Sequence, residues 1–169
     1  ELSIGKLLSN VMETTQKAFQ ADAVSLLLID EETGDLTFQI ALGDVGDEIK
    51  EIYRLKKGQG IAGLVAETGI PLNIEDAYDH PKFSTDYDKK TNYRTRAMLC
   101  VPLKLRNKII GVIQVINKLT KPYIFSPEEL DMLVTISSSA AVAIDTAKMH
   151  KIILQRETLE RDLKLAREV

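Results

Sequence analysis

The stretch of sequence that decides the fold is residues 91–118, which read TNYRTRAMLCVPLKLRNKIIGVIQVINK. Two runs rich in apolar and β-branched residues flank the polar tripeptide formed by Arg106, Asn107 and Lys108. This pattern predicts a β-hairpin in which Asn107 is able to take a positive φ in the turn. Both runs are almost continuously apolar, so we expect other parts of the chain to cover both faces of the hairpin.

One polar residue interrupts the second apolar run of this hairpin. Gln114 falls on the same face of the predicted strand as Val112 and Ile116. A buried amide costs free energy unless something hydrogen-bonds it. The partner of Gln114 is therefore either another part of the protein or a bound ligand.

The composition of the chain excludes several classes of protein. With 169 residues, 44% of them hydrophobic and 28% charged, the chain matches one soluble globular domain. The net charge of −3 argues against a partner that is a nucleic acid bound through its phosphates. Cys100 is the single cysteine, so no disulfide forms within the chain, and a cytoplasmic location fits best. No apolar run has the length of a membrane span, so we expect no membrane partner.

The first half of the chain predicts a hairpin, a glycine-rich helix and a covering loop. We expect, in chain order, an amphipathic leading helix (2–19), a buried strand (23–30), a turn ending at Gly34, a second strand (36–42), a loop (43–46), a polar third strand (53–56), a helix opened and closed by glycines (58–69), a short strand (71–76) and a polar, aromatic-rich loop with a short helix that caps a pocket (77–92).

The start of the glycine-rich helix, GQGIAG at residues 58–63, matches the dinucleotide fingerprint Gly-x-Gly-x-x-Gly. That fingerprint needs a buried parallel strand before it and a crossover unit around it, and the preceding strand here is charged. We therefore discount a dinucleotide site. A helix N-terminus still presents free amides and partial positive charge, which suit an anion, although the glycines also serve simply to permit tight turns.

The C-terminal part of the chain predicts one long helix. Ser126, Pro127 and Glu129 form a helix start with a capping box, and no Pro or Gly follows Glu128. An apolar stripe typical of a coiled coil, interrupted by Arg156, predicts parallel homodimerisation through the terminal helices, and a solvated single helix is the alternative. The stripe consists of Ile152, Leu159, Leu163 and Ala166. Because the chain begins and ends within helices, we expect it to be a piece of a longer protein.

The order of the elements predicts the architecture of the domain. Antiparallel neighbours dominate, and helices lie at both chain ends. We therefore expect an α+β fold, in which an antiparallel sheet carries the N- and C-terminal helices on one face and a ligand pocket with a short helix and loop on the other. The expected units are the leading helix (1–20), the sheet domain (21–147) and a coiled-coil linker helix to a missing output domain (148–169).

Four stretches of the chain carry recognisable motifs: GQGIAG (58–63), LNIEDAYDHPKF (72–83), YRTRAMLCVP (93–102) and GVIQVINK (111–118). Together they resemble the GAF domains of cyclic-nucleotide phosphodiesterases and bacterial signalling sensors. The resemblance implies a pocket that binds a cyclic nucleotide, cAMP or cGMP, and no required cofactor. The pocket residues that it implies are Ser25, Ile61, Ala62, Asp88, Thr91, Thr95 and Gln114. The residues that it implies as structural support are Asn117, Lys118, Phe125 and Glu129.

The chain also departs from that family pattern at several positions. Ala41 and Leu42 stand where related domains carry an aromatic residue and an acid, and Ser84 stands where an aromatic is expected. Gln114 replaces an acid, and Leu130 replaces the last acid of the supporting signature. Lys118 and Glu129 are still expected to form the ion pair of that signature.

Three functions compete on these observations. The first is a regulatory sensor domain that passes a ligand-induced change through its C-terminal helix. The second is a ligand-free dimerisation scaffold, with Tyr78 or Phe83 filling the pocket, for an attached phosphatase of the PP2C type, a cyclase or a kinase. The third is an enzyme, which we disfavour because the sequence offers no nucleophile–base pair, no phosphate-loop lysine and no metal-ligand cluster around His80. Cys100 lies within a strand, where a thiol usually packs as a small apolar group.

Overall fold

The computed structural model describes residues 4–43 and 54–168 of the chain. A six-stranded sheet in the order β3-β2-β1-β6-β5-β4 forms its centre, and every neighbouring pair is antiparallel. The strands are β1 (Ala21–Ile29), β2 (Leu36–Leu42), β3 (Arg54–Leu55), β4 (Leu72–Ile74), β5 (Met98–Leu105) and β6 (Lys108–Lys118). The helices are α1 (Ile4–Ala18), α3 (Gly60–Thr68), the 3-10 turn η1 (Ala77–Asp79), α4 (Asp86–Thr91) and α5 (Pro127–Glu168).

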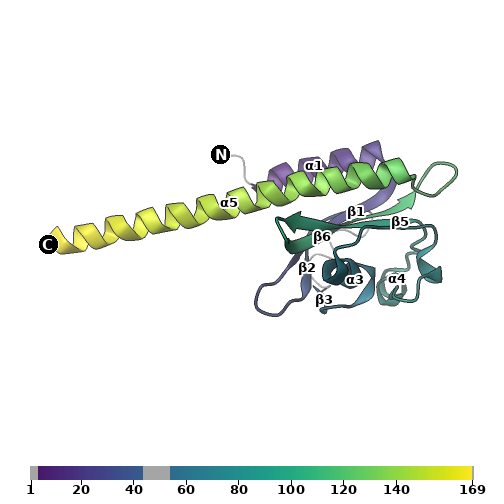
Figure 1. Ribbon diagram of the computed structural model, residues 1–169, viewed down its shortest axis with the longest axis horizontal. Helices are drawn as coiled ribbons and strands as arrows, with labels where there is room; N and C mark the ends of the chain where they lie inside the picture. The colour runs from purple at the N-terminus through teal and green to yellow at the C-terminus, as the bar shows by residue number, and fades with distance from the viewer. Residues whose placement is uncertain (1–3, 44–53, 169) are drawn as a thin grey trace.

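Helices cover both faces of this sheet. The helices α1 and α5 lie side by side on one face, and α3 and α4 lie on the other (Figure 1). Successive strand residues point to opposite faces, so Leu26 joins the core under α1 and α5 while Leu27 joins the core under α3. The predicted α+β architecture, with the two terminal helices on one face, is confirmed.

The central hairpin forms as predicted, but its turn differs from the prediction. Leu105 pairs with Lys108, so only Arg106 and Asn107 form the turn. Arg106, and not Asn107, adopts the positive φ, at 58°. A two-residue hairpin turn needs a positive φ at its first central position, and the extension of β6 to Lys108 places Arg106 there.

Other element boundaries differ from the sequence prediction by a few residues. The leading helix begins at Ile4 among the described residues. Of the predicted third strand (53–56), Arg54 and Leu55 form a strand, whereas Lys56 lies outside it. The predicted loop at 43–46 lies, apart from Gly43, outside the described residues. The glycine-rich helix ends as predicted, because Gly69 adopts a left-handed φ of 69° and its N–H donates to the carbonyl of Val65.

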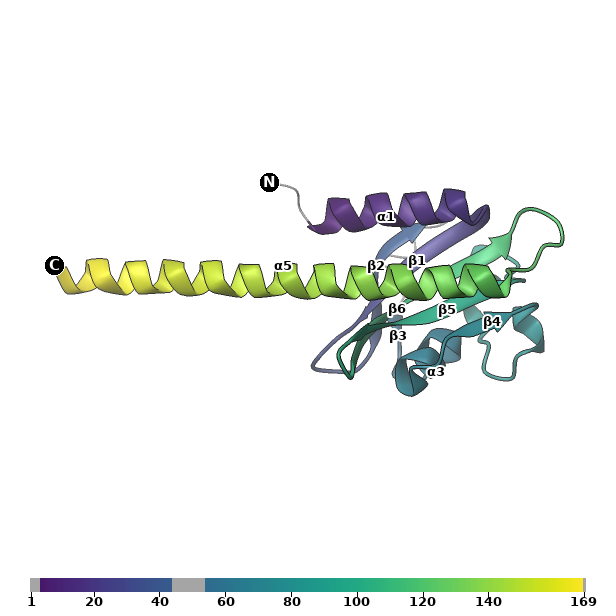
Figure 2. The same cartoon turned by 45° about the horizontal axis from the view of Figure 1, so that its top comes forward.

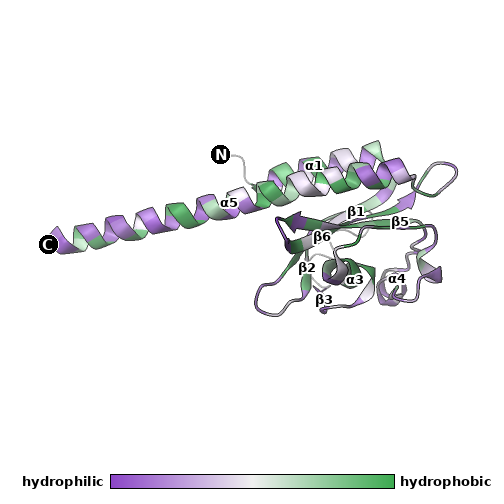
Figure 3. Cartoon of the chain, viewed as in Figure 1, coloured by the Kyte–Doolittle hydropathy of each residue, from purple (hydrophilic) through white to green (hydrophobic). Residues whose placement is uncertain are grey.

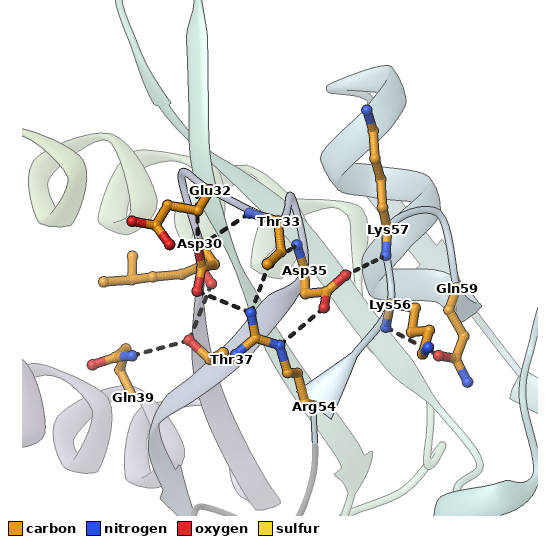
Figure 4. A network of polar contacts seen from close by, with 11 residues as sticks. Asp30, Glu32, Thr33, Asp35, Thr37, Gln39, Arg54, Lys56, Lys57 and Gln59 are labelled. Carbon is orange, nitrogen blue, oxygen red and sulfur yellow. Dashed lines mark hydrogen bonds and ion pairs between the residues drawn. The ribbon is translucent and has the colours of Figure 1, made fainter.

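An exposed polar network ties the turn between β1 and β2 to β3 (Figure 4). The Arg54 guanidinium donates to Asp30 and Asp35, each at 2.9 Å, and to the Thr33 hydroxyl at 2.6 Å. The hydrogen bonds from Arg54 hold the pKa of both carboxyls below their usual values. The backbone N–H of Lys57 also donates to Asp35, so the network fixes the chain just before α3 begins.

The helix α5 begins with the predicted capping box and then extends far beyond the sheet (Figure 2). The Ser126 hydroxyl accepts from the N–H of Glu129 at 3.1 Å, and the Glu129 carboxylate accepts from the N–H of Ser126 at 3.0 Å. The helix α5 is long and apolar enough to cross a membrane by length and composition alone. Buried helices of soluble proteins meet the same criterion. Its first half packs on the sheet through fully buried Leu133 and Ala141. In its projecting half, apolar residues alternate with charged ones (Figure 3).

Candidate ligand-binding site

A cavity lies between the sheet, α3 and the segment that we call the lid, residues 77–97. The volume of this cavity that is open to the centres of water molecules is about 100 Å³. One water needs roughly 10–15 Å³ on this measure, so the cavity holds several waters or a small ligand group. Its described lining comprises Asp22, Ala23, Val24, Ser25, Phe38, Ala41, Leu42, Gly43, Leu55, Gly60, Ile61, Ala62, Phe83, Ser84, Tyr87, Tyr93, Thr95, Met98, Gln114 and Ile116.

Five of the seven pocket residues that the resemblance implies line this cavity. They are Ser25, Ile61, Ala62, Thr95 and Gln114. The three departures from the family pattern at Ala41, Leu42 and Ser84 line it as well. Most of the wall is apolar, and Asp22 is the one charged residue among the described lining residues. A few polar groups on apolar walls are typical of small-molecule sites.

The polar groups of the sheet lie in one row across its three central strands. Ser25 of β1 pairs with Gln114 of β6, which pairs with Cys100 of β5. The Ser25 hydroxyl donates to the Gln114 carbonyl oxygen at 3.5 Å, the upper limit of a hydrogen bond. Gln114 therefore retains hydrogen-bonding capacity toward the cavity.

Cys100 ends this row but is closed to solvent. Its side chain is fully buried, and burial raises the pKa of the thiol to about 12, against the smaller lowering effect of Gln114. The thiolate is the reactive form of cysteine, so a thiol that stays protonated and shielded is inert. Cys100 packs as a small apolar residue, as its position in the strand predicts.

The N-terminus of α3 opens into the cavity without a side-chain cap. Gly60, Ile61 and Ala62 all line the cavity. Gln59, at the cap position, makes no capping bond, because its side-chain oxygen accepts from the N–H of Lys56 at 3.1 Å. The first amides of a helix have no partner within it and carry partial positive charge. This end of the cavity therefore suits a negatively charged group.

The remaining two implied pocket residues do not line the cavity. Asp88 is 3% exposed and accepts three hydrogen bonds, each of 2.8 Å, from the Tyr78 hydroxyl, the Thr95 hydroxyl and the Thr95 N–H. The Thr91 hydroxyl donates to the carbonyl of Tyr87 within α4. Asp88 therefore lies within the lid, where its carboxylate joins Tyr78 near one end of the lid to Thr95 near the other.

The lid carries a second polar cluster on its outer side. Arg94 stacks on the ring of Tyr78 with its guanidinium carbon 3.7 Å from the ring centre. Both carboxylate oxygens of Asp76 also accept from Arg94, at 3.0 and 3.1 Å. Tyr78 is 42% exposed and is not among the residues that line the cavity, which contradicts its predicted role as a plug. Phe83, the other predicted plug, forms part of the cavity wall.

Sequence reasoning missed two residues of the cavity wall that contact each other. The Tyr93 hydroxyl donates to the Asp22 carboxylate at 2.5 Å and accepts from the Asn117 amide at 2.9 Å. Burial, and then the Asp22 carboxylate, raise the pKa of Tyr93 far above its usual value. Tyr93 also packs edge-on against Tyr87. No local pattern joins residues so far apart in the sequence, so only the packing of the lid on β1 reveals the pair.

The four predicted support residues lie together where α1, β6 and α5 meet. Lys118 forms the expected ion pair with Glu129 at 2.8 Å and also donates to the carbonyl of Phe19 at 2.7 Å. The ammonium lies 5.7 Å from the ring centre of Phe125. Asn117 binds the end of the lid, with its side-chain oxygen accepting from the N–H of Arg96 at 2.6 Å. Within residues 4–43 and 54–168, no group of His, Cys, Asp or Glu could hold a metal ion.

Known proteins share this fold and this sequence pattern. The chain is 34% identical over 164 residues to the probable 3′,5′-cyclic phosphodiesterase pde-5 of Caenorhabditis elegans, a match covering 92% of this chain but 22% of that protein. The GAF domain from a phosphoenolpyruvate-protein phosphotransferase of Coxiella burnetii superposes with a TM-score of 0.81 at 24% identity, covering 90% of this chain and 88% of that one.

An enzyme also shares the fold. The free methionine-R-sulfoxide reductase of Neisseria meningitidis, in complex with its substrate, superposes with a TM-score of 0.73 at 18% identity. That match covers 89% of this chain and 83% of the reductase, and identities this low concern the fold alone. The GAF domain family matches residues 3–144, which include α1, the six strands and the first part of α5. The chain therefore belongs to the GAF domain family.

Proposed function

We propose that this GAF domain is a regulatory sensor that binds a cyclic nucleotide, cAMP or cGMP, in the cavity under the lid. The observation that carries the proposal is the uncapped N-terminus of α3, where Ile61 and Ala62 line a mostly apolar cavity. Free helix amides suit a phosphate, and the opposite wall offers the amide of Gln114 and the hydroxyl of Ser25 to a base edge. The similarity to a phosphodiesterase supports the same ligand class.

The charges of the cavity set the orientation of such a ligand. The anionic phosphate is attracted by the N-terminus of α3 and repelled by Asp22, the one charge on the described cavity wall. The base then lies against the sheet, near Ser25 and Gln114. Ligand binding favours the closed lid only if the ligand contacts that state more extensively than the open one.

A calorimetric titration of the protein with cAMP and with cGMP tests this proposal. We expect one site per chain for at least one of them, and a loss of affinity of about 10-fold in the Gln114→Leu variant, because a base edge loses its polar partner. The control is Gln39→Leu, which makes the same change at an exposed position of β2 outside the cavity. Absence of heat with both nucleotides would instead favour the ligand-free scaffold.

The projecting half of α5 supports a second proposal, a parallel homodimer. Four apolar side chains of this half are each between 43% and 60% exposed and follow one another at spacings of three, seven and four residues, as in a coiled coil. They are Met149, Ile152, Leu159 and Leu163. A second copy of the helix would bury this stripe. In sedimentation equilibrium, we expect the protein to be a dimer and the Leu159→Asp/Leu163→Asp variant to be a monomer. If both sediment as monomers, the helix stands alone.

The chain spans 22% of the length of its phosphodiesterase relative. We propose that α5 leads to a C-terminal output domain and transmits the state of the cavity to it. A catalytic output of the PP2C phosphatase, cyclase or kinase type would use such a helix.

A further inference from the structure

We propose that a polar relay couples the cavity to the start of α5, through Tyr93, Asn117, Lys118 and Glu129. The relay gives the regulatory route of the proposed sensor, and its ligand-dependent part rests on that proposed function. Every link except the peptide bond between Asn117 and Lys118 is a hydrogen bond or an ion pair. The relay is needed for this coupling because the lid and α5 lie on opposite faces of the sheet (Figure 1).

The cavity end of the relay is the contact between Tyr93 and Asp22. Both residues line the cavity, and the tyrosine hydroxyl donates to the carboxylate at 2.5 Å. A ligand that brings its own N–H or O–H donor to Asp22 competes with Tyr93 for the same acceptor. A ligand that packs on the ring of Tyr93 strengthens the contact. The occupied cavity therefore differs from the empty one in how Tyr93 is held.

The middle of the relay is Asn117, which ties down the end of the lid. Its amide nitrogen donates to the Tyr93 hydroxyl and to the carbonyl of Arg94, both at 2.9 Å, and its oxygen accepts from the N–H of Arg96. Its backbone φ of 60° is left-handed, and its N–H donates to the carbonyl of Ala97 at 2.8 Å. Asparagine adopts this conformation more readily than most residues other than glycine, and the four hydrogen bonds hold it in place. Movement of Tyr93 therefore acts on the side chain of Asn117, and through it on the backbone at Asn117.

The far end of the relay is the ion pair between Lys118 and Glu129. Their side chains are only 10% and 19% exposed, so water screens the pair weakly. Lys118 also donates to the carbonyl of Phe19, the residue that follows the end of α1, and Glu129 closes the capping box with Ser126. A shift of the backbone at Asn117 thus reaches both helices on the other face of the sheet.

Hydrogen exchange in the absence of any ligand tests the relay. We expect Tyr93→Phe to speed exchange of the backbone amides of Glu129 and Leu130, in the first turn of α5, by about 5-fold or more. The control is Tyr78→Phe, which removes a hydroxyl from the same lid at a site off the relay, bonded to Asp88. The relay is overturned if the two variants give the same exchange rates at these amides.

Thermodynamic reciprocity supplies the second test. If the cavity biases the first turn of α5, then a change at that turn must in return alter the affinity of the cavity for its ligand. We expect Glu129→Gln to change the affinity for the cyclic nucleotide by about 5-fold or more, and Lys148→Gln, which breaks an exposed ion pair of α5 with Glu31, to leave it unchanged. The effects of Tyr93→Phe and Glu129→Gln should be non-additive in the double variant.

The two tests separate failure of the relay from failure of the sensor. If the unaltered protein binds neither cAMP nor cGMP, the proposed ligand is wrong, and the exchange experiment still decides the relay. If the protein binds a cyclic nucleotide with an affinity that Glu129→Gln does not change, the relay alone is wrong.

Discussion

Replacing Gly111 by alanine is expected to lower the free energy of unfolding by about 3 kcal/mol or more. Gly111 is buried in β6 between β1 and β5, and a Cβ atom there would lie 2.1 Å from the carbonyl oxygen of Leu27. That oxygen belongs to the backbone of the central strand, so it cannot rotate aside as a side chain does. Urea denaturation of the Gly111→Ala variant measures the loss.

A second glycine of the same protein serves as the control. Gly60 has open space around its Cβ position, where the nearest atom is the Cβ of Ser84 at 4.0 Å. Its φ of 69° is left-handed, so Gly60→Ala should cost only the backbone term, about 1–2 kcal/mol. Equal losses at the two positions would show that the close contact at Gly111 is relieved without cost.

Replacing Asp88 by alanine is expected to destabilise the protein by about 3 kcal/mol, with no ligand present. The variant leaves three donors without their acceptor: the Tyr78 hydroxyl, the Thr95 hydroxyl and the Thr95 N–H. Thr95 is 2% exposed, so water cannot readily replace the lost carboxylate. Because these bonds join the two ends of the lid, the lid should also become more susceptible to proteolysis. Urea denaturation and limited proteolysis of the ligand-free protein measure both effects.

The control for Asp88 is an acid on the same short helix. Asp86 is exposed in the first turn of α4, and Asp86→Ala removes a carboxylate without leaving a buried donor unpaired. We expect it to change stability by less than about 1 kcal/mol. A similarly small effect of Asp88→Ala would contradict the structural role and return Asp88 to the group of candidate ligand contacts.

The elements that sequence reasoning predicted well are those that local patterns determine. The apolar runs around the central hairpin predict β5 and β6, and the capping box of Ser126 and Glu129 predicts the start of α5. Gly69 predicts the end of α3 because a helix commonly closes on a left-handed glycine. Each of these signals lies within a few residues of the feature that it predicts.

The features that sequence reasoning missed depend on packing between distant segments. Asp88 bonds Tyr78 and Thr95 and does not line the cavity, because of how α4 packs against these two residues. The residues of the motif do not specify that packing. The contact of Tyr93 with Asp22 joins the lid to the first strand, and the turn at Arg106 depends on how far β6 extends. Polar side chains at such positions look the same in the sequence whether they face a ligand or the protein itself.

The polar residues Ser25 and Gln114 illustrate the intermediate case. Their interruption of apolar strand patterns predicts that they lie inside the protein and need a partner. The structure places them side by side on the cavity wall, with a 3.5 Å contact between them. The sequence alone leaves open whether these two side chains hydrogen-bond each other or a ligand. The hydrogen bond between them is long, so each can also bind a further partner in the cavity.

The most direct measurement of ligand binding is a crystal structure of the protein grown with cAMP or cGMP. We expect one nucleotide in the cavity, with phosphate oxygens within hydrogen-bonding distance of the amides of Ile61 and Ala62 and the base against Gln114. A cavity that holds only water or the protein's own side chains at saturating nucleotide would contradict this expectation.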